Sequence, residues 1–234
     1  MPQSRVYCIS GIDTGIGKTI VTGLLAESCQ KKGIRTITQK VVQTGCSGLS
    51  EDIIRHRQIM GIELQPVDIS GLTCPYVFPV PCSPHLAARL ENQRIDCDVI
   101  QKATESLLRQ YDLVLLEGAG GLFVPLNEEE TLIDYFQAEK YPLILVSSSR
   151  LGSINHTLCA LELARSRNIE VIAIIYNCFE GSDPRIEKDS KEIFIKHMKK
   201  NGFSGPVIDL LPYAKYQKGE EKFAFFELVN INFE

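Results

Sequence analysis

The sequence lacks the features of membrane proteins and of nucleic-acid-binding proteins. No apolar run approaches the roughly 18 residues that a transmembrane helix needs, and the first 15 residues do not resemble a secretory signal peptide. The 25 lysines and arginines are scattered along the chain and the net charge is −4, which argues against a basic surface for nucleic acid or for a membrane. We therefore expect a cytoplasmic protein, with no nucleic-acid or membrane partner, in which any bound phosphate is small and locally held.

Paired cysteines are also missing. The eight cysteines lie singly in apolar runs and form no C-x-x-C pair, which predicts free thiols rather than disulfides. The 234 residues, 44% of them hydrophobic, are enough for one domain whose core needs no disulfide or metal for stability. We expect a single domain over residues 1–234, with a tail of uncertain role from about residue 215. That tail could form a last helix or an aromatic segment that packs on a neighbour.

Short apolar runs alternate with longer segments of helical period, which is typical of βα units on a mostly parallel sheet. The expected strands are Arg5–Ser10, Thr36–Val41, Asp112–Glu117, Leu143–Ser147, Val171–Tyr176 and Val207–Leu211. The expected helices are Lys18–Lys32, Ser50–Met60, Asp98–Gln110, Ser153–Arg167 and Arg185–Lys200. Strands that are apolar on both faces need helices above and below, so the pattern predicts a three-layer α/β/α sandwich. Prolines interrupt the pattern between Gly61 and Pro84, where we expect an excursion over the edge of the sheet that could line a site.

The strongest motif is GIDTGIGKT at residues 11–19, which joins the first expected strand to the first expected helix. This strand–loop–helix context predicts a phosphate-binding P-loop and a P-loop NTPase type of fold. Backbone N–H groups and the positive end of the helix would hold an anion, with Lys18 reaching the outer phosphates and the Thr19 hydroxyl placed for Mg²⁺. The loop is a variant, because the usual first glycine falls at Ile12 and this chain has Gly11 instead.

A P-loop also needs a carboxylate for its metal ion. Glu117 ends a buried strand and is followed by Gly118, Gly120 and Gly121, so we expect it to serve this purpose. Asp52 is a weaker candidate on its own, because an acidic residue early in a helix usually only favours the helix dipole.

Several ordered motifs together resemble the dethiobiotin synthetase family, and the resemblance extends to about Ala214. They are GIDTGIGKT at 11–19, QKVVQTG at 39–45, SED at 50–52, CSPHLAARLE at 82–91, EGAGGLFVPL at 117–126, RLGSINH at 150–156, YN at 176–177 and LPYA at 211–214. The resemblance implies ring closure on 7,8-diaminononanoate (7,8-diaminopelargonate) with CO₂, ATP and Mg²⁺, through a carbamate and a carbamic–phosphoric anhydride. It also implies a homodimer with shared active sites.

The resemblance assigns roles to individual residues. Lys18 and Lys40 would be catalytic and flank the transferring phosphoryl group, and Thr19, Asp52 and Glu117 would hold the metal. The implied ATP contacts are Thr14, Gly15, Ile16, Gly17, Lys18, Thr19, Ile20, Asp52, Glu117, Gly118, Ala119, Gly120, Asn177, Cys178, Pro212, Tyr213 and Ala214. The implied substrate contacts are Thr44 and Ser83 for the diamine, and Gly152, Ser153, Ile154 and Asn155, from the second subunit, for the carboxylate.

This chain departs from the family pattern at Gly15, where the family commonly has glutamate, and at Val41, where it commonly has proline. We expect the first change to weaken ATP binding modestly. His85 and His156 lie in the motifs without metal-ligand spacing, and we interpret both as structural.

Two other functions remain to be weighed against this reading. A P-loop ATPase switch of the partitioning or scaffold kind would carry a lysine where this loop has Asp13. A cobyrinate-type ligase generally carries a further glutaminase domain, for which 234 residues leave no room.

Overall fold

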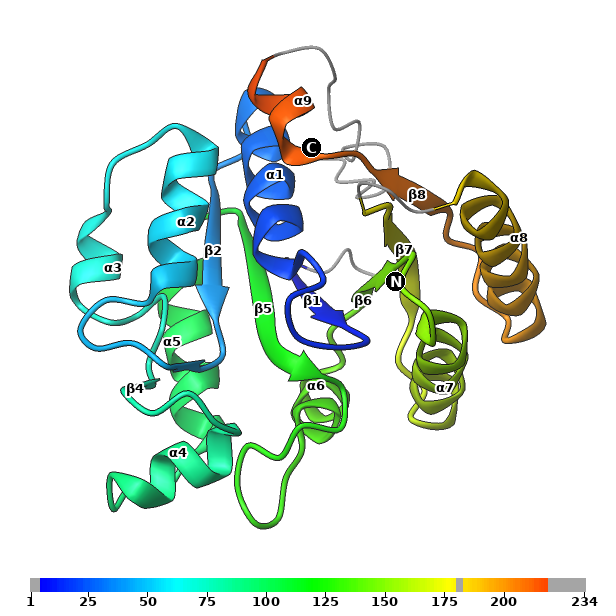
Figure 1. Ribbon diagram of the computed structural model, residues 1–234. Coiled ribbons are helices and arrows are strands. Elements are labelled where there is room, and N and C mark those ends of the chain that lie inside the picture. Colours follow the sequence, from blue (N-terminus) through cyan, green and yellow to red (C-terminus); the bar gives the residue numbers. More distant parts are fainter. Residues whose placement is uncertain (1–4, 180–182, 219–234) are drawn as a thin grey trace.

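Six parallel strands form the central sheet, in the order β2–β5–β1–β6–β7–β8 (Figure 1). The computed structural model describes residues 5–179 and 183–218. The strands are β1 Val6–Gly11, β2 Thr36–Lys40, β5 Leu113–Gly121, β6 Leu143–Ser148, β7 Val171–Asn177 and β8 Val207–Leu210. All six expected strands are confirmed.

Helices connect the strands. They are α1 Lys18–Lys31, α2 Glu51–Met60, α3 Pro66–Ile69, α4 Pro84–Leu90, α5 Cys97–Leu108, α6 Leu132–Glu139, α7 Ser153–Ser166, α8 Pro184–Lys200 and α9 Tyr213–Gln217. The five expected helices are confirmed, whereas α3, α4, α6 and α9 were not expected. For α6 the sequence carried a signal that was overlooked: Thr131 and Asp134 form a capping box at its start.

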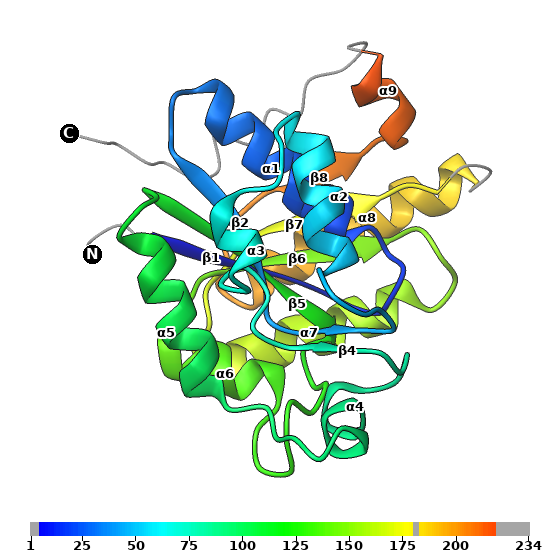
Figure 2. The ribbon, with the colours of Figure 1, turned by 90° about the vertical axis from the view of Figure 1, so that its left-hand side faces the viewer.

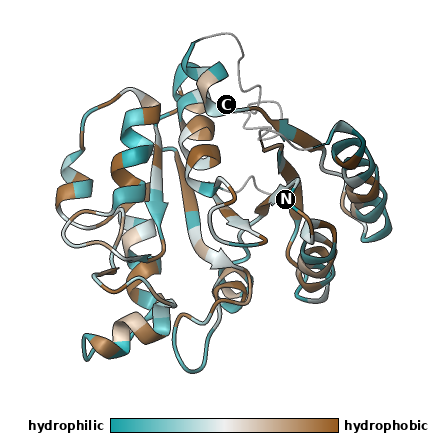
Figure 3. Ribbon diagram, viewed as in Figure 1, coloured by the Kyte–Doolittle hydropathy of each residue, from teal (hydrophilic) through white to brown (hydrophobic). Residues whose placement is uncertain are grey.

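Two cores separate the layers, one on each face of the sheet. Side chains alternate along a strand, so Leu113 and Leu115 of β5 face the core beneath α1 and α2, whereas Val114 and Leu116 face the core beneath α5 to α8. Figure 2 shows the strands running between these two sets of helices. Hydrophobic residues follow the central strands, and hydrophilic residues are prominent on α8 (Figure 3). The expected three-layer α/β/α sandwich is therefore confirmed.

The proline-rich excursion crosses the edge of the sheet at β2, as expected. The Lys40 backbone N–H donates to the Thr73 carbonyl at 2.7 Å, which ties the excursion to this edge strand. Strand β4 (Val77–Phe78) pairs with β3 (Gln43–Thr44) in a separate parallel ladder. The excursion thus holds the segment that follows β2 near the carboxyl end of the main sheet.

Other expectations can also be checked. All eight cysteines are free thiols, as expected. Within the ranges that the structure describes, no helix is both long enough and apolar enough to cross a membrane. The expectation for the tail falls mainly on residues 219–234, which lie outside the described residues.

Candidate active site

The loop between β1 and α1 lies at the carboxyl end of the sheet, where ligands of open α/β folds bind. Its displaced glycine has a packing reason. A Cβ on Gly11 would lie 2.3 Å from Cδ1 of Ile16, whose side chain folds back into the core and is 1% exposed. Glycine at position 11 therefore makes room for Ile16, and the loop keeps its strand–loop–helix form.

Lys18 begins α1 and is held against the loop itself. Its Nζ donates to the Asp13 carbonyl at 2.7 Å. Burial, together with the charge of Lys40, lowers the pKa of Lys18 to about 8. An anion bound in the loop would favour the charged form of this ammonium group.

Four side chains from four elements meet around Glu117, which lies in the middle of β5, beside the carboxyl end of β2. The sequence predicted that this strand ends at Glu117, but β5 continues to Gly121. The Lys40 Nζ lies 2.7 Å from Glu117 Oε1 and 2.7 Å from Asp52 Oδ2, and it also donates to the Gly118 carbonyl at 3.1 Å. The Thr19 hydroxyl lies 2.9 Å from Asp52 Oδ1 and 3.2 Å from Glu117 Oε1. The sequence-predicted catalytic lysine and the predicted metal ligands are therefore in direct contact.

The charges in this cluster support one another. Burial would raise the pKa of Glu117, but the charge of Lys40 and the hydrogen bond from His56 outweigh it and hold that pKa far below its ordinary value. Burial would likewise lower the pKa of Lys40, but Glu117 and Asp52 raise it above its ordinary value. Both groups are charged at neutral pH, so the lysine can stabilise a phosphoryl group and the carboxylate can bind a metal ion.

A cavity of about 460 Å³ opens over this cluster and the P-loop. It brings together half of the predicted site residues: Thr14, Gly15, Gly17, Lys18, Thr19, Ile20, Lys40, Thr44, Asp52, Glu117, Ala119 and Gly120, with Val42 and Gln43. The cavity thus combines the P-loop with the region after β2 where the diamine is expected.

The residues expected around adenine lie outside this cavity, and one of them contacts the P-loop. Asn177, at the end of β7, donates from its Nδ2 to the Ile16 carbonyl at 2.8 Å. Cys178 follows it, Pro212 comes after β8, and Tyr213 and Ala214 begin α9. The Arg55 guanidinium lies 4.9 Å from the centre of the Tyr213 ring, which connects α9 to α2.

The remaining predicted substrate contacts do not line the cavity. Ser83 is the N-cap of α4, and Gly152, Ser153, Ile154 and Asn155 form the start of α7. The Ser153 hydroxyl is buried and lies 2.8 Å from Ser148 Oγ, whereas Gly152 and Asn155 are exposed. The start of α7 is therefore open to solvent rather than to the site of its own chain.

One site residue was missed in the sequence. His56 is fully buried, and its Nε2 lies 2.8 Å from Glu117 Oε2. The available signal was its spacing of four residues from Asp52, which puts the two side chains on the same face of α2.

The donor set at Glu117 suits a hard divalent cation. Thr19, Asp52 and Glu117 present only oxygen atoms, which Mg²⁺ prefers, and Mg²⁺ usually keeps phosphate oxygens and waters as its other ligands. No group of three or more His, Cys, Asp and Glu residues capable of holding a metal occurs in the described part of the chain. The oxygen ligands of Thr19, Asp52 and Glu117 suit a Mg²⁺ ion whose other ligands are the phosphate oxygens of a nucleotide.

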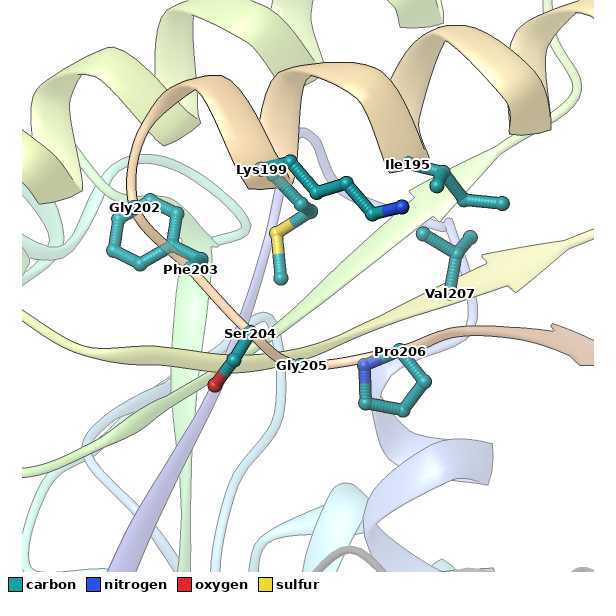
Figure 4. A pocket seen from close by; sticks show the side chains of 9 residues that line it. Ile195, Lys199, Gly202, Phe203, Ser204, Gly205, Pro206 and Val207 are labelled. Atoms are coloured by element: carbon teal, nitrogen blue, oxygen red, sulfur yellow. The ribbon is translucent and has the colours of Figure 1, made fainter.

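A second hollow, of about 660 Å³, lies between α8 and the segment that leads into β8 (Figure 4). Its lining is mainly apolar, with Lys199 as its charged side chain. It opens near the amino end of β8, whereas the P-loop lies at the carboxyl ends of the strands. We therefore place the chemistry in the cavity over Glu117.

The fold and the loop define a P-loop nucleotide-binding protein, and solved structures agree. MinD in the MinC:MinD complex of Aquifex aeolicus has a TM-score of 0.55 at 14% identity, and the match covers 96% of this chain and 89% of that one. A ParA family ATPase from Chlorobium tepidum has a TM-score of 0.52 at 15% identity, covering 92% of this chain and 87% of that one. At such low identity these matches show the fold alone.

Comparison of sequences identifies the family. Residues 5–216 match a family described as an AAA domain. The chain is 54% identical over 209 residues to the ATP-dependent dethiobiotin synthetase BioD of Chlorobaculum tepidum, covering 89% of this chain and 87% of that protein. It is 50% identical over 198 residues to BioD 2 of Pasteurella multocida, covering 85% and 93% respectively. The chain belongs to the dethiobiotin synthetase family, the ATP-dependent ligases of biotin biosynthesis, and the resemblance read from the motifs is confirmed.

Gly17 provides a test of the P-loop geometry. Its φ is 101°, and a Cβ there would lie 2.8 Å from Asn177 Nδ2. We expect Gly17→Ala to weaken ADP binding by roughly tenfold, equivalent to about 1.4 kcal/mol, as measured by calorimetry. Gly33→Ala is the control, because Gly33 has a φ of 85° with open space around it and lies after α1, away from the cavity. Both variants carry a left-handed alanine that costs about 1–2 kcal/mol, so an equal loss of ADP binding in both would contradict the assignment.

Proposed function

We propose that this chain converts 7,8-diaminononanoate, CO₂ and ATP into dethiobiotin, ADP and phosphate in the cavity over Glu117. The observation that carries the proposal is the pairing of two lysines in one P-loop cavity. Lys18 and Lys40 both line it, and Thr44 lies on the same wall. A nucleotide hydrolase needs the P-loop lysine, but a second buried lysine beside a substrate pocket suits a reaction that also handles an anionic carbamate.

The proposed reaction has three steps. One amine of the diamine attacks CO₂, which forms a C–N bond and, after loss of a proton, a carbamate. A carbamate oxygen then attacks the γ-phosphorus of ATP, and the bond to the ADP oxygen breaks. The second amine attacks the carbamate carbon, phosphate leaves with the electron pair of the C–O bond, and a proton is released as the cyclic urea closes.

The chain's own groups match these needs. In the proposal, Lys40 lies beside the carbamate and the transferring phosphoryl group, and Lys18 lies on the other side of that group. Their charges offset the negative charge that spreads over the oxygens during transfer. Thr44 binds the diamine or carbamate end, and Ser83 contributes to the diamine pocket.

The nucleotide extends from the loop toward Asn177 and Cys178 in the proposal, with adenine against Asn177 and the segment Pro212 to Ala214. One Asn177 proton is used by Ile16, which leaves the second proton and the amide oxygen for the edge of a base. Thr19, Asp52 and Glu117 would hold Mg²⁺, which would neutralise phosphate charge when bound.

We also propose that the active form is a cytoplasmic homodimer. The start of α7 is exposed and does not line its own cavity, although helix N-termini bind carboxylates well. Leu151, directly before it, is fully exposed. A second copy that covered Leu151 would bring Gly152 and Asn155 to the carboxylate end of the diamine.

The deciding experiment measures phosphate release from ATP and Mg²⁺ with and without 7,8-diaminononanoate and bicarbonate, while mass spectrometry follows the diamine. We expect release to depend on the diamine, and the product to gain one carbonyl group. Slow phosphate release at the same rate with and without the diamine would instead indicate a switch ATPase, whose partners would be proteins.

Lys40 provides the sharpest prediction within this reaction. We expect Lys40→Ala to lower the turnover rate by about 100- to 1000-fold, because its charge matters most as phosphoryl transfer proceeds. ADP binding, measured by calorimetry, should persist, since the P-loop remains intact. Lys31→Ala is the control because it removes a lysine from the exposed ion pair with Glu27. Turnover near that of the wild type in Lys40→Ala would refute the catalytic role.

The shared site can be tested by mixing two variants that are defective in different parts of it. Lys40→Ala should inactivate the cavity and Asn155→Ala should weaken carboxylate binding from α7. If α7 acts on the neighbouring cavity, mixed dimers contain one intact site, so the mixture should be more active than either variant alone. Mixtures that never exceed the separate variants would contradict the shared site.

A further inference from the structure

His56 stands between the metal-binding cluster and a buried polar network behind it. Its ring is fully buried, with Nε2 2.8 Å from Glu117 Oε2 and Nδ1 3.0 Å from Thr38 Oγ1. Such a fixed ring could simply fill space in the core. Its two polar contacts, however, join the proposed metal ligand to a network with its own charge pair.

The donors in this network can be assigned one by one. Asp68 holds the Arg57 guanidinium by two hydrogen bonds of 2.9 and 2.8 Å. Arg57 Nη1 donates to Thr38 Oγ1 at 2.8 Å, so this oxygen already accepts a proton. The Thr38 hydroxyl can therefore donate its own proton to His56 Nδ1. His56 Nε2 carries a proton, because its partner, the ionised Glu117 carboxylate, can only accept.

This order of donors orients the Glu117 carboxylate. His56 occupies Oε2, and Oε1 is left facing Thr19 and Lys40. A carboxylate tied in this way presents one defined oxygen to a cation instead of rotating between alternatives, which is how supporting hydrogen bonds orient metal ligands.

We infer that His56 is a positioning residue for the nucleotide-bound cation. It donates from Nε2–H to Oε2 of Glu117 while Thr38 holds the other side of the ring, and so it keeps Glu117 turned with Oε1 toward the cation. The inference rests on the proposed metal role of Glu117. One face of α2 would then carry two residues of the cation site. Asp52 would touch the cation directly, and His56, one turn later, supports the ligand Glu117.

The test compares ADP affinity with Mg²⁺ and with EDTA, so it does not depend on turnover. In the wild type we expect Mg²⁺ to strengthen ADP binding. In His56→Leu this gain should fall by about 10- to 100-fold, the usual loss when a supporting partner of a metal ligand is removed, while affinity in EDTA stays unchanged. His56→Gln should recover much of the gain, because its amide can still donate to Glu117.

A matched pair of threonine variants separates positioning from packing. Thr38→Val removes the hydroxyl that faces His56. Thr104→Val, in α5, removes an equally buried hydroxyl that lies away from the site. This hydroxyl donates to Oε1 of Gln39, a β2 residue, at 2.7 Å. We expect the increase in ADP affinity that Mg²⁺ produces to be smaller in Thr38→Val and unchanged in Thr104→Val. In ¹⁵N NMR of the histidine rings, the His56 signal should show the Nε2–H form in the wild type and change in Thr38→Val.

The outcomes are distinguishable. If the ADP affinity of the wild type does not depend on Mg²⁺, both the metal role of Glu117 and the inference about His56 are wrong. If Mg²⁺ strengthens ADP binding in the wild type and does so equally in a folded His56→Leu or Thr38→Val variant, the inference about His56 is wrong and the metal role of Glu117 stands. If His56→Leu does not fold, Thr38→Val and the NMR signal decide the matter.

Discussion

The Glu117 carboxylate is fully buried in the middle of β5, and an ionised carboxylate in such a place is costly unless charged and polar groups surround it. The structure surrounds it from three directions. Lys40 comes from the neighbouring strand β2, Thr19 from the first turn of α1 and His56 from α2. Each element must dock correctly for the charge to be satisfied, so the site and the packing of α1 and α2 on the sheet depend on one another. Removing any one partner leaves a buried charge poorly solvated.

The two lysines of the cavity differ because their surroundings differ. Burial disfavours the charged form of both. Lys40 has two carboxylates within 2.7 Å, and its pKa is raised. Among the residues that the structure describes, the hydrogen-bond partner of the Lys18 ammonium group is the Asp13 carbonyl, and the pKa of Lys18 falls to about 8. Lys40 is therefore a fixed charge, whereas Lys18 gains most from the arrival of a phosphate.

Much of this arrangement could be predicted from the sequence, for physical reasons. The strands could be predicted because they are buried on both faces, and the P-loop because glycines and a lysine follow a strand at fixed spacing. The short helix α6 was missed because the capping box of Thr131 and Asp134 at its start was overlooked. His56 was missed because a single histidine in a helix usually belongs to the core. Its partner Thr38 lies 18 residues away, and only the folded chain shows that Arg57 has already used that hydroxyl oxygen.

The distribution of polar groups also bears on assembly. The P-loop and the ion pairs of Lys40 with Asp52 and Glu117 line one cavity of a single chain. The start of α7 has the opposite character: its backbone end is exposed, and the Ser153 hydroxyl is used internally by Ser148. At this helix N-terminus the Ser153 N–H donates to the Arg150 carbonyl at 3.0 Å, and the neighbouring Leu151 is fully exposed. The long diamine has two different ends, and in the proposed dimer each end meets the kind of surface that suits it: paired charges within one subunit, and helix N–H groups from the other.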